Sequence, residues 1–548
     1  MIVNKTKILM VGWDGATFDI LLPLARQGRL PNFARLMQNG SWGRLTSTIP
    51  PLTPVAWTTI STGVNPGRHG IFDAMGFNRQ ELRVRFVNAG ARRVKPVWTL
   101  LSEAGLSVGV MNVPVTYPPD RVNGFCIPGM FSPEGAPDFM HPVELFKEIE
   151  KNCGKYLLEC RQVNEPEGYL KSILEMVDYR EKTALYLQKK FNPDFFFVAF
   201  MASDRVQHFF WKYLDKAHPD HARYCDSIAK VYERLDKTLG RLIDAAPGDP
   251  TVIMVSDHGS GPLKKAFFLN NWLIKNGYLR LKQDPGEAFR PIARSKVVSG
   301  IKKSIKRIIP ESVLNNLKPS PSGKGMPERA SDELSAFIRL IDWEGTTAFS
   351  EGVAGGIFIN RDNVPDDRYG AVAGEIKKRL LDLKDAEEGV NVIDAVHCSR
   401  DVYSGDALQN APDLIPICSS GYQVIAPNEF FFFGSKYTDA LFIPHRWSGR
   451  HEMEGIFVAS GAAVERGKTL EKISVEDVTP TILYLTGANI PEGLDGRVPI
   501  CAITEDYASK NPIKYAKQDV SSEGKASGFS DSEEKEITDK LKSLGYME

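Results

Sequence analysis

The sequence predicts an α/β sandwich with a mixed, mainly parallel central sheet. Four apolar runs of strand length each precede a polar turn and a helix-like segment; they are residues 8–12, 107–112, 194–200 and 251–256. Continuous apolar strands separated by helical segments indicate a parallel sheet that is covered on both faces. The chain has 548 residues and is longer than the roughly 300 at which a single core stops growing, so we also expect insertions or a cap.

The strand-and-helix pattern is interrupted between about residues 271 and 340 by a basic stretch punctuated with Pro and Ser. We interpret residues 271–340 as an inserted lid or cap. It separates a first part of the core, residues 1–270, from a second part, residues 341–510. In the second part, strand-like runs occur at residues 355–360 and 455–461, and a helix-like segment follows at residues 475–487.

Residues 290–309 of the expected lid are basic and carry apolar side chains near helical spacing. One interpretation is a basic amphipathic helix that touches a membrane surface. The other is a solvated cap helix whose apolar stripe packs on the main domain, and we favour it.

Residues 511–548 are expected to form a linker and a C-terminal helix. The first part is rich in Lys, Ser and Gly, which is typical of a flexible linker. Ser530 and Glu533 then have the spacing of a capping box, and apolar residues recur at helical spacing across residues 537–544. We expect this helix to dock on the body of the protein.

The composition excludes several function classes. Lys plus Arg equals Asp plus Glu, at 68 each, so no overall positive field indicates a nucleic-acid-binding protein. No segment approaches the roughly 20 apolar residues that span a bilayer. The chain opens without a secretory leader, and its seven cysteines show neither CxxC spacing nor a disulfide framework. We therefore expect a cytoplasmic protein, and the oligomeric state stays open.

Acidic and imidazole side chains follow three of the four predicted strands. Asp14, Asp204 and Asp257 each lie within a few residues of a strand end, His258 is adjacent to Asp257, and His208 is four residues after Asp204. Ligands gather at the carboxyl ends of parallel strands. The spacing of Asp204 and His208 places both on one face of a helix or on one rim of a tight loop.

Each of these signals has a structural alternative. A strand-end Asp is commonly a turn or helix cap, and an Asp/His pair is commonly a solvated surface pair. Divalent zinc-like ions, however, need neutral imidazole and carboxylate ligands that converge from distant parts of the chain. Downstream, His445 and His451 precede another apolar run, and we favour His451 because its Gly-Arg-His unit leads directly into the strand.

A further motif occupies residues 50–73, PPLTPVAWTTISTGVNPGRHGIFD. With the acidic and histidine positions, it resembles the alkaline phosphatase superfamily, in particular its type I phosphodiesterase and nucleotide pyrophosphatase branch. The matching elements are Thr53, the Thr62-Gly63 pair and the Pro-x-x-His-Gly-Ile turn that contains His69. The resemblance implies an alkaline-phosphatase-like three-layer sandwich.

The resemblance also implies a site with two divalent metal ions, zinc or alternatively manganese. It implies that Asp204, His208 and His451 would hold one ion, and that Asp14, Asp257, His258 and the Thr53 oxygen would hold the other. Three carboxylates and one alkoxide supply four negative charges, which balance two divalent ions and leave the site able to accept an anionic phosphate. The expected reaction is in-line displacement at phosphorus through a phospho-Thr53 intermediate.

One position departs from that branch. Ala74 stands where the branch has an Asn that donates to a phosphoryl oxygen, so a nucleotide is not the indicated substrate. The sulfatase branch requires a modifiable Cys or Ser followed by Pro and Arg, and the segment Thr53-Pro-Val-Ala-Trp57 lacks both that type of nucleophile and the Arg. We therefore expect a metal-dependent hydrolase of small phosphate esters, most consistent with phosphodiesters or pyrophosphate-type bonds.

Two alternatives remain open at this stage. The first is a phosphomonoesterase or phosphomutase that uses the same metals; it would need a cation near the nucleophile, for which Arg68 is the only close candidate in the sequence. The second is a non-catalytic metal-binding or scaffold protein.

Overall fold

The computed structural model describes most of the chain. The described residues are 6–78, 83–133, 136, 138–161, 165–282, 336–424, 440–522 and 529–544. The expected lid therefore lies mostly outside the described residues, and the basic stretch 290–309 lies entirely outside them.

The core of the protein is an eight-stranded sheet, as the sequence predicts. The order is β20 (Lys468–Ser474), β2 (Gly40–Thr46), β19 (Glu454–Ser460), β8 (Thr251–Val255), β1 (Ile8–Trp13), β7 (Phe195–Phe200), β5 (Val108–Val113) and β6 (Gly124–Pro128). Only β19 runs antiparallel to its neighbours in this sheet; the other pairings are parallel. The prediction of a mixed, mainly parallel sheet is confirmed.

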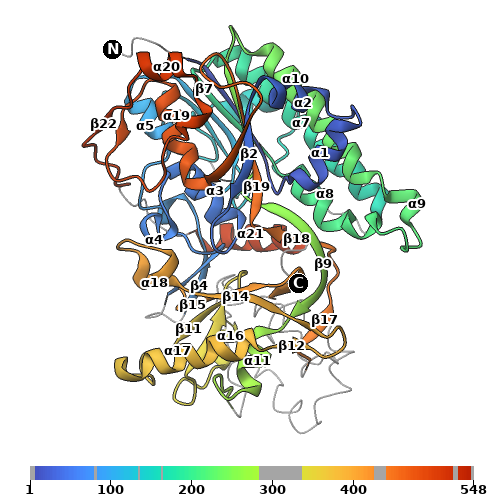
Figure 1. Ribbon diagram of the computed structural model, residues 1–548, viewed down its shortest axis with the longest axis vertical. Helices are drawn as coiled ribbons and strands as arrows, with labels where there is room; N and C mark the ends of the chain where they lie inside the picture. Colours follow the sequence, from blue (N-terminus) through green and yellow to red (C-terminus); the bar gives the residue numbers. More distant parts are fainter. Residues whose placement is uncertain are drawn as a thin grey trace, which may run out of the picture.

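Helices cover both faces of this sheet, which makes three layers (Figure 1). One face carries α1 (Phe18–Arg26), α2 (Pro31–Asn39), α7 (Pro166–Phe191), α8 (Ala202–Phe210) and α10 (Ser227–Ala245). The other carries α3 (Thr53–Thr62), α5 (Val97–Glu103), α19 (Val478–Leu485) and α20 (Glu505–Lys510). Successive β1 side chains enter different cores, since Leu9 belongs to one buried cluster and Met10 to the other.

A smaller body lies below the main sheet in Figure 1. Its antiparallel sheet has the order β10 (Ala348–Glu351), β11 (Gly356–Ile359), β15 (Leu414–Cys418) and β14 (Ile393–Cys398), and α17 (Asp366–Leu381) packs against it. The run at 355–360 thus forms a strand of this second sheet, whereas the run at 455–461 becomes β19 of the main sheet. An apolar run predicts a strand but carries no information about which sheet it joins.

One long strand connects the two bodies. β9 (Gly259–Phe267) follows β8 directly and pairs with β16 (Gly421–Val424), β17 (Phe442–Pro444) and β18 (Gly449–Glu452). Figure 1 shows β9 running from the main body into the smaller one.

The C-terminal helix forms as predicted. α21 (Asp531–Leu544) begins with the expected capping box, in which the Ser530 amide donates to Glu533 Oε2 at 2.7 Å and the Glu533 amide donates to Ser530 Oγ at 3.4 Å. Ile537 is buried, and Phe529 stacks on Tyr117 of the main body with ring centroids 5.9 Å apart.

The remaining elements are short. They are α4 (Pro66–His69), β3 (Met75–Asn78), β4 (Arg83–Phe86), α6 (Leu145–Cys153), α9 (His221–Tyr224), α11 (Leu269–Lys275), α16 (Ala336–Leu340), β12 (Lys384–Asp385), β13 (Val390–Asn391), α18 (Ser399–Val402), β21 (Ile490–Pro491) and β22 (Tyr515–Ala516), with short 3-10 turns between them. Within the described part of the chain, no helix combines the length and the apolar character needed to cross a membrane.

The packing of β1 against α3 generates a stability prediction. A Cβ at Gly12 would lie 2.6 Å from Trp57 Cη2, so Gly12→Ala must displace the buried Trp57 ring. We expect it to lower the free energy of unfolding by about 1–3 kcal/mol, measured by urea denaturation.

The matched control is Gly374→Ala in α17, where no atom lies within 4 Å of an added Cβ. We expect this exposed helical position to gain roughly 0.5–1 kcal/mol, because alanine restricts the unfolded chain. Equal responses of the two variants would contradict close packing at Gly12.

Candidate metal centre

The carboxyl ends of three neighbouring strands meet at one edge of the main sheet. Asp14 follows β1, Asp257 follows β8, and Asp204 lies in the first turn of α8 just after β7. These strands end together because their registers align, with Trp13 opposite Phe200. All three carboxylates are at most 2% exposed. The fold therefore brings three predicted site residues together without help from loops.

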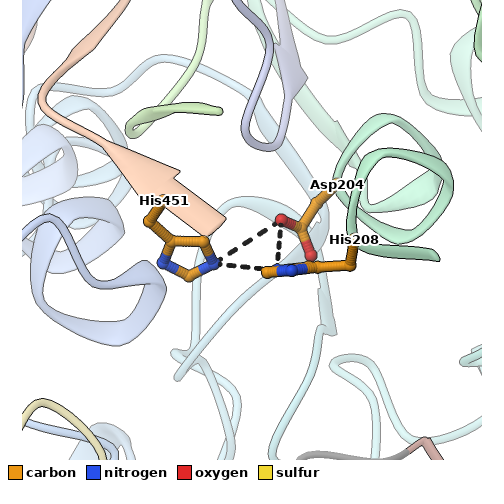
Figure 2. Close-up of side chains that lie close together, drawn as sticks. All are labelled: Asp204, His208 and His451. Carbon is orange, nitrogen blue, oxygen red and sulfur yellow. Dashed lines mark hydrogen bonds and ion pairs between the residues drawn. The ribbon is translucent and has the colours of Figure 1, made fainter. Parts of the chain in front are cut away.

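The first group at this edge consists of Asp204, His208 and His451 (Figure 2). His208 Nε2 lies 3.0 Å from Asp204 Oδ1 and 3.1 Å from His451 Nε2, and His451 Nε2 lies 3.6 Å from Asp204 Oδ1. α8 supplies the Asp204/His208 pair from one helical face, and β18 supplies His451. The open choice between helix and loop for this pair is resolved as a helix.

The second group consists of Asp14, Asp204 and His258. His258 Nε2 is 3.6 Å from Asp14 Oδ1, 3.3 Å from Asp257 Oδ2 and 3.2 Å from Thr53 Oγ1. Asp204 thus faces both groups. All seven residues predicted from the sequence lie at one site.

Backbone carbonyls fix the orientation of the three imidazoles. Nδ1 of His208 lies 2.7 Å from the Gly449 carbonyl, Nδ1 of His258 lies 2.8 Å from the Gly259 carbonyl, and Nδ1 of His451 lies 3.0 Å from the Pro51 carbonyl. A carbonyl only accepts, so each neutral ring carries its proton on Nδ1 and directs the Nε2 lone pair into the cluster. This is how metal-binding histidines are commonly held.

Burial makes this cluster costly for charged groups. It raises the pKa values of Asp14 and Asp257 well above their usual range, and repulsion by Asp204 adds to both shifts. Burial lowers the pKa of His451, as it does for His258, so these rings are favoured in the neutral form that binds metals.

The donor set fits two divalent cations. Among the described residues, Asp14 Oδ1 and Asp257 Oδ2 are buried without a hydrogen-bond partner, and such oxygens cost free energy unless a cation satisfies them. Three carboxylates and three imidazole Nε2 atoms converge there, which is the nitrogen and oxygen chemistry of zinc-type sites. The arrangement is that of a site for two metal ions.

Thr53 does not act as the cap of α3. The helix begins at Thr53 itself, its N-cap residue is Leu52, and no side chain makes a cap hydrogen bond. The Thr53 hydroxyl instead faces Nε2 of His258, which lacks a proton in the tautomer above, so the hydroxyl donates. Thr53 is therefore not a helix cap, and its hydroxyl belongs to the cluster.

Sequence reasoning missed the residues that hold the ligands. Trp57 Nε1 donates to Asp14 Oδ2 at 2.7 Å, and Ser203 Oγ donates to the Asp14 carbonyl at 2.7 Å. The buried Arg205 guanidinium lies 3.6 Å from Asp204 Oδ2 and 3.3 Å from Glu159 Oε2. Trp57, Ser203 and Arg205 lie close in sequence to predicted site residues, and this closeness was the only signal for them. It did not indicate which groups they contact.

The second half of the motif at residues 50–73 is structural. His69 accepts from the Ile71 amide through Nδ1, so its Nε2 carries the proton and donates to Thr59 Oγ1 at 2.9 Å. Burial lowers the pKa of His69 to about 3, and the ring is therefore neutral. Gly63 ends α3 in a left-handed conformation with φ of 69°. These contacts position α3, and with it Thr53.

A cavity of about 270 Å³ opens onto the cluster, and Thr53, His208 and His451 line it. Ala74 also lines this cavity, whereas His445, the alternative to His451, lies on its wall and outside both ligand groups. The site is thus accessible to a small molecule from the side of the smaller body.

Known proteins share this architecture. Residues 8–429 match the sequence model of the type I phosphodiesterase / nucleotide pyrophosphatase family. No curated protein matches significantly.

Solved structures cover nearly the whole fold. Phosphonoacetate hydrolase from Sinorhizobium meliloti 1021, in complex with phosphonoformate, is 14% identical, with a TM-score of 0.52 over 88% of this chain and 95% of that one. An inactive variant of murine ectonucleotide pyrophosphatase / phosphodiesterase 5 with AMP is 15% identical, with a TM-score of 0.48 over 88% and 96%. The human protein of that name is 16% identical, with a TM-score of 0.46 over 88% and 95%. At 14% identity, the likeness to phosphonoacetate hydrolase shows the fold alone, which is alkaline-phosphatase-like.

Two further buried carboxyls, those of Asp73 and Glu351, lie near the cavity wall. Asp73 accepts from the amides of Val353 at 3.0 Å and Ala354 at 2.9 Å, and Glu351 lies at the start of the same loop. Burial, with repulsion by Asp73, raises the pKa of Glu351 to about 8. Glu351 is therefore largely protonated in the folded protein at neutral pH.

This pKa predicts a pH-dependent stability. Between pH 4.5 and 8 the folded state retains the Glu351 proton that the unfolded state has released, so Glu351 lowers stability as pH rises through this window. Glu351→Gln should therefore gain stability relative to wild type by about 1–3 kcal/mol between pH 5 and 8. Urea denaturation at several pH values measures the difference, with the exposed Glu344→Gln as control. A pH-independent difference for both variants would contradict a protonated Glu351.

Proposed function

The chain belongs to the type I phosphodiesterase / nucleotide pyrophosphatase family, and from this premise we propose that it hydrolyses phosphodiesters or pyrophosphate-type bonds at a centre of two divalent metal ions. The observation that carries the proposal is the convergence of three deprotonated imidazole Nε2 atoms and three buried carboxylates beside the Thr53 hydroxyl. The membership supports metal-dependent hydrolysis of phosphate esters; the substrate and the residue roles are our proposals.

Each of the two ions has a proposed set of ligands. Asp204, His208 and His451 would hold one, and Asp14, Asp257, His258 and the Thr53 oxygen would hold the other. The Asp204 carboxylate also belongs to the second group, so it would be available as a ligand to either ion. Imidazole and carboxylate donors favour zinc, with manganese as the alternative.

Side chains of the protein position the reacting groups. Bound divalent ions supply the positive charge that lowers the pKa of a hydroxyl and offsets charge on phosphoryl oxygens. The Thr53 oxygen attacks phosphorus opposite the leaving ester oxygen, which departs with the bonding electron pair, and phospho-Thr53 forms. Water then cleaves that phosphoester and restores the Thr53 hydroxyl. Trp57 and Arg205 hold Asp14 and Asp204 in place during these steps.

In the described part of the chain, Arg68, the candidate cation for the phosphomonoesterase or phosphomutase alternative, makes other contacts. Arg68 donates to the Gly493 carbonyl, pairs with Asp495 at 3.3 Å, and does not line the cavity. The scaffold alternative would predict a lost ligand, yet all seven positions carry the expected residue type. We also expect residues 271–340 to select substrates, because inserted segments near a sheet edge commonly control access to a site; most of these residues lie outside the described residues.

The proposed nucleophile is tested by substituting Thr53. We expect Thr53→Ala to lower kcat on bis(4-nitrophenyl) phosphate by several orders of magnitude, because it removes the attacking oxygen, while Thr53→Ser retains partial activity. The thermal midpoint should change little. Mass spectrometry of the quenched enzyme should identify a phosphorylated peptide that contains residue 53.

A true helix cap is the matched control. Thr504 caps α20 by accepting from the Tyr507 amide at 3.3 Å, so Thr504→Ala should cost about 1 kcal/mol of stability and leave kcat intact. An active Thr53→Ala enzyme would refute the nucleophile assignment.

The metal content provides a separate test. We expect elemental analysis to find close to two divalent ions per chain, a chelator to abolish activity, and zinc to raise the thermal midpoint of the stripped protein. His208→Ala should leave one ion bound, as should His258→Ala, whereas His445→Ala should leave two. Full activity in a protein stripped of metal would overturn the proposed centre.

A further inference from the structure

We propose that Gln207 is a positioning residue that links the two metal sites: it lies on the helix that supplies ligands to one ion and holds the turn that supplies ligands to the other. The first ion is the one that α8 and β18 would hold. The second ion is the one that Asp14 and Asp257 would help to hold. The inference rests on the proposed function, because it concerns the metal centre on which that function depends.

The turn after β1, residues 14–16, lies against the ligand cluster. Gly15 has a left-handed backbone with φ of 64°, and a Cβ added there would lie 3.1 Å from Asp204 Oδ1. The Gly15 amide donates to Asp257 Oδ1 at 3.2 Å. The place of this turn therefore affects two proposed ligands of the second ion, Asp14, which belongs to the turn, and Asp257, which accepts from it.

Two serines next to the second ion's ligands hold the turn from one side. Ser256 Oγ donates to the Ala16 carbonyl at 2.8 Å. Ser260 Oγ donates to the Gly15 carbonyl, also at 2.8 Å. Since Ser256 directly precedes Asp257, these contacts join parts of the chain that supply ligands to the same ion.

Two residues of α8 hold the turn from the other side. Gln207 Nε2 donates to the Gly15 carbonyl at 2.8 Å. Ser203 Oγ donates to the Asp14 carbonyl at 2.7 Å. Gln207 and Ser203 are four residues apart and share one stripe of the helix, next to the stripe that carries two proposed ligands of the first ion. One helix thus contacts the second ion's turn and the first ion.

The side-chain amide of Gln207 has a defined orientation. The Gly15 carbonyl only accepts, so the group that faces it is the NH₂ of the amide. Gln207 is 1% exposed, and among the described residues its Oε1 has no hydrogen-bond partner. A buried amide that is only partly hydrogen-bonded costs free energy. An apolar side chain would fill this space without that cost, so the contact with the turn is what glutamine adds here.

Zinc affinity tests the inference without requiring turnover. The first ion is studied alone in His258→Ala and the second alone in His451→Ala, each titrated with zinc against a competing chelator. We expect Gln207→Met to raise the Kd of the second ion by about tenfold and that of the first by less than about twofold, because groups that orient metal ligands commonly contribute this much. A general disturbance of α8 would instead weaken the first ion, since α8 carries its ligands.

Gln188→Met is the matched control. Gln188 is also buried, and its Nε2 donates to the Leu242 carbonyl at 3.1 Å. Its Oε1 likewise has no hydrogen-bond partner within the described part of the chain. Because Gln188 lies in α7 and in neither ligand group, the same substitution should leave both zinc affinities unchanged.

Ser203→Ala is a second variant of the same contact. It removes the other donor from α8 to the turn, so it should also weaken the second ion more than the first. If Gln207→Met does not fold, the Ser203→Ala affinities decide the question in the same way.

The outcomes separate the inference from the function on which it rests. Equal effects on the two ions, a larger effect on the first, or no effect on either would overturn the role of Gln207, even in a protein that hydrolyses phosphate esters. A wild-type protein that binds no zinc would overturn both the centre and the inference. Selective weakening of the second ion, in a protein that hydrolyses no phosphate ester, would support the role of Gln207 and reject the proposed hydrolysis.

Discussion

Three carboxylates are buried side by side at the end of the central sheet, and the surrounding structure must offset the free-energy cost of their negative charge. Asp14, Asp204 and Asp257 lie where β1, β7 and β8 end together, and burial opposes the charged form of each. Because these strands are parallel and their registers align, their carboxyl ends lie at the same edge of the sheet. The site therefore needs positive charge, and the chain supplies little of it: Arg205 lies near Asp204 but is shared with Glu159. Divalent cations remove the remaining cost.

β9 couples the metal centre to the cavity. It begins directly after His258, and its Ser260 pairs with His451 of β18, so one strand register sets the stacking of the two rings, whose centroids are 3.6 Å apart. Further along, β9 pairs with β16, whose Val424 belongs to the cavity wall. A shift of β9 would thus move a proposed ligand and the substrate-facing wall together. This coupling explains why a second sheet lies against an otherwise self-sufficient sandwich.

The sequence was informative where local pattern and function coincide. Apolar runs located five strands of the main sheet, and polar residues at the ends of three of them located Asp14, Asp204, Asp257 and His258, because strand ends are where such a fold can gather ligands. The sequence did not predict the contacts between distant segments. Nothing in the sequence indicated that Trp57 would donate to Asp14, or that Asp204 would face both groups. The second sheet was not predicted for the same reason, since the sequence of an apolar strand does not indicate which strand it pairs with.

Charge counting connects the centre to the kind of substrate that it suits. While the Thr53 hydroxyl keeps its proton, two proposed divalent ions carry four positive charges and Asp14, Asp204 and Asp257 carry three negative ones, which leaves one positive charge for the substrate. Ionisation of Thr53 supplies the fourth negative charge, and Arg205 and Glu159 cancel each other nearby. A diester brings one negative charge and balances that sum, whereas a monoester brings up to two. The excess charge would need a cationic side chain, and Arg450 already donates to backbone carbonyls.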